Sequence, residues 1–142
     1  MTAGVFWRWT RDRDGGAAVE FAMVAPIFLL MLIGILAYGL YFGLSHSVEE
    51  LAAQAARVSI AGLSDSERNA LAKSYLAKNA QFYPLIDTRR LSVSAGPAAG
   101  EPDVFVVSLR YDLSNSLLDL FPEVLPPHPE ITASAAVQRG GY

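Results

Sequence analysis

The pattern of hydrophobic positions changes twice along this chain. Between Phe21 and Leu44 there is no charged residue, and Pro26 is the single proline. If this run is helical, a rise of 1.5 Å per residue makes it roughly 36 Å long, which is enough to cross a bilayer with some tilt. The run therefore predicts one membrane-spanning helix near the N-terminus.

Beyond the apolar run, hydrophobic residues return at intervals of three and four. This spacing predicts that one helix continues over about 17–61, with Gly62 as its stop. The repeating positions are Val48, Leu51, Ala52, Ala55, Val58 and the small residue Ser59. Ser64 and Glu67 have the spacing of a capping box, which predicts a second helix that Pro84 closes.

Further along the chain the period changes to two. Alternating apolar and polar residues predict three strands, at 91–95, 105–113 and 131–137. A loop is expected at 96–102, a short helical turn at 116–121 and a rigid extended linker at 126–129. The expected fold class is α+β, with a long N-terminal transmembrane spine helix, a second helix and a small three-stranded antiparallel sheet.

The composition of the chain mainly excludes classes of function. The chain has 142 residues, a formal net charge of −3 and no cysteine. The length suits one small domain beside the membrane helix, the charge gives no electrostatic reason to expect nucleic acid, and disulfides and thiolate metal sites are excluded. His46 and His128 have no partner at metal-ligand spacing, and no catalytic motif is present. We therefore expect no enzyme activity, no metal and no cofactor.

Charges on the two sides of the apolar run predict its orientation. Arg8, Arg11 and Arg13 precede the run, whereas Glu49 and Glu50 follow it. An excess of Lys and Arg on the N-terminal side predicts that this end stays in the cytoplasm. The chain beyond the run would then lie outside, in the periplasm of a Gram-negative cell or its equivalent.

The residues that lead into the run read Asp14-Gly15-Gly16-Ala17-Ala18-Val19-Glu20-Phe21-Ala22, with Pro26 following. This stretch resembles the TadE family of pilin-like proteins from tight-adherence (Tad/Flp) pilus systems, and the similarity extends over about 11–62. Type IV prepilins and their relatives are cut after a glycine on the cytoplasmic side, and a glutamate is fifth in the mature protein. With Gly15 as the last leader residue, Glu20 is fifth. A cut after Gly16 instead would make Glu20 fourth.

The resemblance implies a division of the chain and a set of partners. Residues 1–15 would be a cytoplasmic prepilin-type leader, 16–62 the transmembrane spine helix, and 63–142 a periplasmic α+β head domain. The implied function is that of a minor pilin or pseudopilin of a Tad-type (Flp) type IV pilus, in pilus assembly, tip formation or adhesion. The implied partners are a prepilin peptidase, the major Flp pilin, other pseudopilins, the inner-membrane Tad assembly platform and the lipid bilayer.

Glu20 is the candidate for setting the register between subunits. Residues four apart share a helix face, so an amine freed at Gly16 could neutralise the Glu20 carboxylate of the same or a neighbouring subunit. The resemblance implies that this pairing sets axial register. It also places Phe21 where Flp-type pilins usually carry tyrosine. The alternative is a solvated carboxylate at headgroup depth, which favours the helix N-terminus through the helix dipole.

Three more positions in the helix are candidates. Pro26 removes a backbone hydrogen bond and is expected to kink the helix, although membrane helices also tolerate proline without consequence. Gly39 and Gly43 form a pair of small residues four apart, which allows another helix to approach closely.

A second interpretation stays open. The chain could be a single-pass, membrane-anchored periplasmic binding or sensing domain that is neither cleaved at Gly15 nor polymerised. The mass of the membrane-extracted protein separates the two interpretations, because only a pilin loses its leader.

Overall fold

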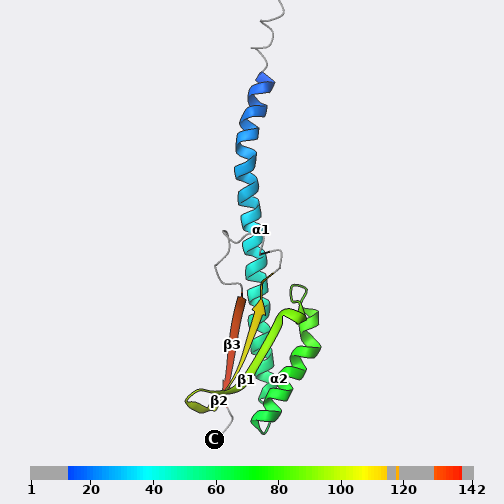
Figure 1. The fold of residues 1–142 in the computed structure, drawn as a ribbon, viewed down its shortest axis with the longest axis vertical. Coiled ribbons are helices and arrows are strands. Elements are labelled where there is room, and N and C mark those ends of the chain that lie inside the picture. The colour runs from blue at the N-terminus through cyan, green and yellow to red at the C-terminus, as the bar shows by residue number, and fades with distance from the viewer. Residues whose placement is uncertain (1–12, 115–117, 119–129, 139–142) are drawn as a thin grey trace, which may run out of the picture. The chain divides into compact units, whose positions relative to one another are not determined.

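A computed structural model of the chain describes residues 13–114, 118 and 130–138 (Figure 1). The contacts between residues divide the chain into two units, residues 1–36 and 37–142. The elements in chain order are α1 (Arg13–Ser59), α2 (Asp65–Asn79), the 3-10 turns η2 (Ala80–Phe82) and η3 (Thr88–Arg90), and the strands β1 (Leu91–Ala98), β2 (Glu101–Asp112) and β3 (Glu130–Gln138). The predicted α+β fold class is confirmed.

The first unit contributes the N-terminal part of α1. Its large apolar side chains from Val19 to Leu36 are mostly exposed, which would be unfavourable in water. By length and composition α1 is apolar enough to cross a membrane. The predicted long apolar helix is therefore confirmed, and it fits a membrane anchor.

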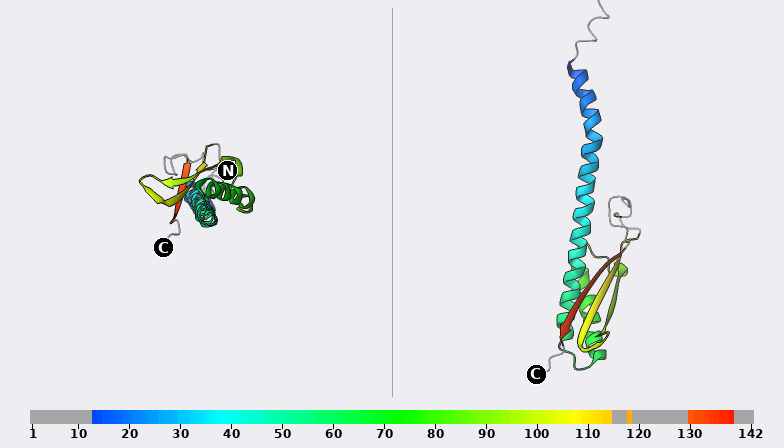
Figure 2. Two further views of the ribbon diagram at one scale, coloured as in Figure 1. Left: turned by 90° about the horizontal axis from the view of Figure 1, so that it is seen from below. Right: turned by 90° about the vertical axis from the view of Figure 1, so that its left-hand side faces the viewer.

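The second unit packs two helices on one face of the sheet. The strands lie in the order β1-β2-β3, and both pairs are antiparallel. Residues 37–59 of α1 and the whole of α2 lie on the same side of the sheet (Figure 2). The helices cover the face of β2 that carries Phe105, Val107 and Leu109, and all three are fully buried. These are alternate residues, as the alternation in the sequence predicted for the central strand.

The core of this unit combines large side chains on the sheet with small ones on the helices. Val48 and Leu51 are the largest fully buried residues of α1. They join alanines and the buried face of β2 in one cluster, whose buried alanines are Ala52, Ala55, Ala56, Ala72, Ala80 and, on β3, Ala133. Helical residues at these spacings share one face, so the period of three and four correctly identified the side of α1 that is buried.

The start of α2 follows the predicted capping box. The Ser64 hydroxyl accepts a hydrogen bond from the backbone N–H of Glu67 at 3.2 Å. The Glu67 carboxylate in turn accepts from the backbone N–H of Leu63 at 2.9 Å, one residue before the N-cap. Both bonds satisfy donors that have no partner within the helix.

Two predicted boundaries are wrong. The second helix ends at Asn79, before Pro84, and continues only as the 3-10 turn η2. The Asn79 side-chain amide donates to the backbone carbonyl of Tyr75 at 2.9 Å, and asparagine favours helix ends because its side chain hydrogen-bonds locally.

The loop expected at 96–102 is mostly strand. Only Ala99 and Gly100 connect β1 to β2, and Gly100 has a φ of 84°, which glycine adopts without strain. Pro97 is tolerated because β1 lies at the edge of the sheet. Pro102 precedes Val104, where the pairing with β3 begins, so no hydrogen bond to β3 is lost there. The helical turn predicted at 116–121 and the linker at 126–129 fall outside the described residues, apart from Leu118.

Gly62, in the turn between α1 and α2, is closely approached by Arg68. A Cβ atom there would lie 2.7 Å from both the backbone nitrogen and the Cγ of Arg68. Gly62→Ala should therefore lower the free energy of unfolding by about 1 to 3 kcal/mol, because the backbone of α2 must shift. Gly96→Ala is the matched control, since a Cβ at Gly96 meets nothing within 4 Å.

Thermal unfolding of the full chain in detergent measures this difference. The Gly96 variant should stay within about 0.5 kcal/mol of the parent. Equal melting of the two variants would show that the turn adjusts freely and that the close approach at Gly62 is unimportant.

Candidate functional site

The positions predicted to matter for cleavage lie in the first turn of α1. The helix begins at Arg13, so the bond between Gly15 and Gly16 is within helical backbone. A Cβ at either glycine would meet nothing within 4 Å, so no other described part of the chain packs on them. The first four N–H groups of a helix have no partner within it, and each glycine weakens a helix by about 1 kcal/mol relative to alanine. The bond therefore lies where little free energy is needed to unwind the helix for a protease.

Glu20 lies one helical turn after Gly16. Both residues are exposed and both are within α1, so they share a helix face. None of the ion pairs within the described residues involves Glu20. The neighbouring Phe21 is among the exposed apolar residues. A carboxylate beside an apolar helix surface is unfavourable in lipid unless it is paired, so Glu20 is available for a partner from outside this chain or for an amine at Gly16.

Pro26 does not end the helix. The structure assigns α1 without interruption from Arg13 to Ser59, with Pro26 inside it. Proline has no N–H, so the carbonyl of Ala22, four residues earlier, has no donor within the helix. This turn of α1 therefore has one hydrogen bond fewer than a regular helix, and the kink at Pro26 stays a prediction.

Gly39 and Gly43 have different surroundings. Both belong to the second unit. A Cβ at Gly39 would meet open space, whereas a Cβ at Gly43 would lie 3.1 Å from Cδ1 of Leu85, in the connection between α2 and β1. Gly39 is thus open to an external helix, and Gly43 is approached by a side chain of its own domain. Their role in helix packing stays a prediction.

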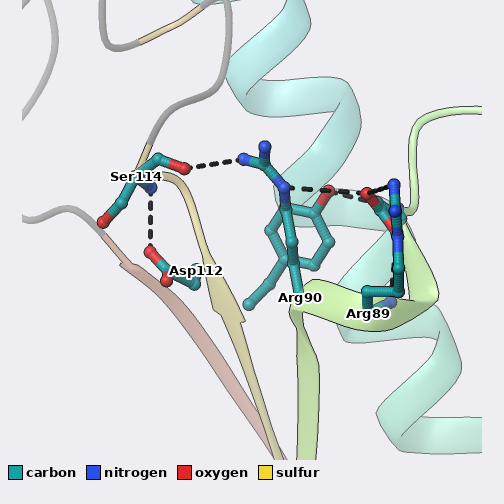
Figure 3. A network of polar contacts seen from close by, with 6 residues as sticks. Arg89, Arg90, Asp112 and Ser114 are labelled. Carbon is teal, nitrogen blue, oxygen red and sulfur yellow. Dashed lines mark hydrogen bonds and ion pairs between the residues drawn. The ribbon is translucent and has the colours of Figure 1, made fainter.

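A polar network lies at the end of the sheet where β1 begins (Figure 3). The Arg89 guanidinium donates to both carboxylate oxygens of Asp87, at 3.1 and 3.0 Å. The backbone N–H of Asp87 donates to the hydroxyl of Tyr111 at 3.2 Å. The hydrogen bonds from Arg89 hold the pKa of Asp87 below its usual value, so this carboxyl group stays ionised.

The same network reaches the end of β2. Arg90 donates from Nη1 to the backbone carbonyl of Ser114 at 2.8 Å, and the N–H of Ser114 donates to Asp112 at 2.8 Å. The hydrogen bonds that the Asp112 carboxylate accepts from Ser114 lower the pKa of Asp112. A general acid needs a raised pKa, and neither aspartate has one. The network therefore fastens the start of β1 to the end of β2 and has a structural role.

A half-open groove of about 430 Å³ lies between α2 and β1. Its walls are mostly apolar or uncharged, with one cation, and are formed by Lys73, Leu76, Ala77, Ala80, Gln81, Thr88, Leu91 and Val93. Within the described ranges, no three His, Asp or Glu side chains lie close enough to hold a metal ion. The expectation that the chain is not an enzyme stays a prediction.

Arg68 is the residue that the sequence analysis missed. Only 8% of it is exposed, and its Nε donates to the carbonyl of Gly62 at 3.0 Å. The guanidinium carbon lies 5.9 Å from the centre of the Phe105 ring, and Nη1 has no hydrogen-bond partner among the described residues. The signal was the spacing of four in α2, because Arg68, Ala72 and Leu76 are its three buried residues.

Comparison with known proteins gives one family. The model of the family described as TadE-like protein matches residues 15–57. The resemblance drawn from the glycine pair, Glu20 and Pro26 is therefore confirmed over these residues. The match covers most of α1 and ends before α2 begins. No curated protein and no solved structure gives a significant match.

Proposed function

We propose that this chain is a minor pilin or pseudopilin of a Tad-type (Flp) pilus. The observation that carries the proposal is the order of features in α1: two exposed glycines in its first turn, Glu20 one turn later, and then a long apolar surface. This order is the one a prepilin peptidase substrate needs, since cleavage, charge pairing and lateral packing take place in that sequence along the helix. The TadE-like match over residues 15–57 supports the same proposal.

The proposed mechanism begins with cleavage between Gly15 and Gly16 by the peptidase. The cut frees an α-amine one turn before Glu20, on the same helix face. In lipid, the amine and the carboxylate of the same or an adjacent subunit neutralise each other. A charge pair 4 Å apart is worth several times more near a low-dielectric surface than in water. Between adjacent subunits, the Gly16 amine and the Glu20 carboxylate meet at only one axial offset. This pairing therefore sets the register of the filament.

The head domain favours a minor role. The second unit adds α2 and a three-stranded sheet to the spine, so each copy would place a bulky domain on the filament. Such a domain is difficult to repeat at the close axial spacing of a thin pilus. We therefore place the protein at the tip or at the start of assembly, beside the major Flp pilin, other pseudopilins and the inner-membrane Tad platform.

The proposed location follows from charge and hydrophobicity. Before cleavage the chain sits in the inner membrane as a single-pass protein, with the arginine-rich leader in the cytoplasm and the head domain in the periplasm. After assembly the head reaches the extracellular pilus.

The groove between α2 and β1 favours a second candidate function. A cavity of about 430 Å³ is within the range of small-molecule sites, so the head domain could bind a ligand while the helix acts only as an anchor. In this alternative the leader is retained and the chain does not leave the membrane.

One experiment separates these functions. An epitope tag is placed after Tyr142, and filaments are sheared from cells that contain the complete pilus system. We expect the tagged chain in the sheared fraction, shortened by its leader, at a small ratio to the major pilin. Recovery of the tag only in the membrane fraction, at the mass of the uncut chain, would support the anchored domain and contradict the pilin proposal.

A further inference from the structure

The connection between α2 and β1 exposes large apolar side chains. Phe82 is 74% exposed, and Leu85 is 42% exposed. Two such residues close together in a short connection are unusual for a surface in water. Its apolar part, residues 80–86, also contains Pro84 and the 3-10 turn η2, so its backbone is compact.

The level of this connection relative to α1 is fixed within the second unit. Cδ1 of Leu85 would be 3.1 Å from a Cβ on Gly43, so the connection lies against that turn of α1. Gly43 is next to the last residue of the uncharged run that ends at Leu44. About 20 helical residues cross the hydrocarbon core, so a run that starts at Phe21 leaves the core shortly before Gly43. Leu85 therefore lies at the depth where lipid headgroups begin.

Aromatic residues of α1 support the same depth. Three aromatic residues lie near the C-terminal end of the run: Tyr38, Tyr41 and Phe42. The ring centre of Phe42 is 6.0 Å from that of Tyr38 and 5.9 Å from that of Tyr41. Tyrosine is enriched where a membrane helix meets the headgroups. Phe42 directly precedes Gly43, so its exposed ring lies at the same level of α1 as the exposed side chain of Leu85.

The charges nearby suit a lipid surface. Arg89, which follows the apolar connection, keeps most of its side chain exposed even though it is bonded to Asp87. An apolar tip with a basic residue at its edge is the composition of segments that rest at the boundary between headgroups and acyl chains. The first acidic side chains of α1 beyond the uncharged run lie at the far side of this connection from the bilayer. Glu50, seven residues beyond Gly43, is hydrogen-bonded to the side chain of Tyr83.

We propose that the connection 80–86 rests in the interfacial layer of the outer leaflet and holds the head domain against the bilayer. Phe82 and Leu85 enter the boundary of the acyl chains, and the contact of Leu85 with Gly43 transmits their depth to α1. The head domain then has a preferred depth and tilt while the protein is in the membrane. This inference requires that the apolar run spans the bilayer, and it holds whether or not the chain enters a filament.

Quenching by brominated lipids tests this depth in the full chain. Trp7→Phe and Trp9→Phe remove the native tryptophans, and Phe82→Trp then supplies one reporter. The protein is reconstituted at low density into phosphatidylethanolamine/phosphatidylglycerol liposomes with bromine near the start of the acyl chain. We expect the fluorescence of the Phe82→Trp protein to fall to less than half of its value in unbrominated liposomes.

Two further single-tryptophan proteins make the result decisive. Phe42→Trp reports on the end of the span and should be quenched. Leu63 lies in the turn between α1 and α2 and is 96% exposed. A tryptophan at this position, in the Leu63→Trp protein, should not be quenched. If Phe42→Trp is quenched while Phe82→Trp behaves like Leu63→Trp, the span is correct and the docking proposal is wrong. Protection of the Phe82→Trp reporter that appears only at high protein density would likewise overturn it, in favour of contact between copies of the chain.

Discussion

Glu20→Gln should abolish entry of this chain into filaments while it still inserts into the membrane and loses its leader. Glutamine keeps the shape and hydrogen bonding of the side chain but removes its charge. The amine on Gly16 would then remain unpaired in a low-dielectric environment. A net loss of only about 1.4 kcal/mol per subunit contact lowers incorporation about tenfold, and a buried unpaired amine exceeds that loss. The tagged chain in sheared filaments, relative to the membrane pool, measures the effect.

The matched control is Glu49→Gln. Glu49 is on the same helix but beyond the uncharged run, and its side chain is solvated. This variant should enter filaments like the parent. A Glu20→Gln chain that is cleaved normally and enters filaments at the parental ratio would defeat the pairing argument. Glu20 would then be a solvated carboxylate that only favours the helix N-terminus.

Gly15→Leu should block removal of the leader and leave the whole chain in the membrane. The resemblance implies that the peptidase binds this residue in a narrow site, where a branched side chain would clash. The structure adds a second reason, because leucine is a better helix former than glycine by nearly 1 kcal/mol and would strengthen the turn that must unwind. The intact mass of membrane-extracted protein, from cells that contain the peptidase, measures processing.

Gly16→Ala provides the control for this experiment. It adds a methyl group in open space on the other side of the bond and also stabilises the turn, but it leaves Gly15 unchanged. We expect this variant to be cleaved, with alanine as its first residue. Blocked cleavage in both variants would assign the effect to helix stability, while normal cleavage of Gly15→Leu would contradict a cut at this bond. N-terminal sequencing of the parent separates a start at Gly16 from a start at Ala17, which would make Glu20 fourth.

Local patterns in the sequence were sufficient for the parts of the molecule that depend on neighbouring residues. The uncharged run predicted the apolar helix because lipid requires many consecutive apolar side chains. The capping box at Ser64 and the alternation around Phe105 were read correctly because they depend on spacings of three and two. The candidate site could also be predicted from the sequence, because Gly15, Gly16 and Glu20 lie within one and a half helical turns of each other.

Contacts between distant segments decided the rest. The hairpin at Gly100 extends further than its glycines and prolines suggested, because pairing across β1 and β2 outweighs local propensity. Arg68 is buried because the turn at Gly62 places its backbone carbonyl within reach and Phe105, from a strand far along the chain, covers it. The spacing of four in α2 marks the position of Arg68 as buried, but it does not show which carbonyl and which aromatic ring receive the guanidinium there.

The same distinction applies to function. The sequence by itself determined that the chain has an apolar helix with a glycine pair at its start and a lone carboxylate at its edge. Only the tertiary structure brought Leu85 against Gly43 and thereby gave the head domain a level along the helix. The physical reason is that hydrophobicity and spacing act along the chain, whereas depth and burial depend on which remote side chains occupy the same space.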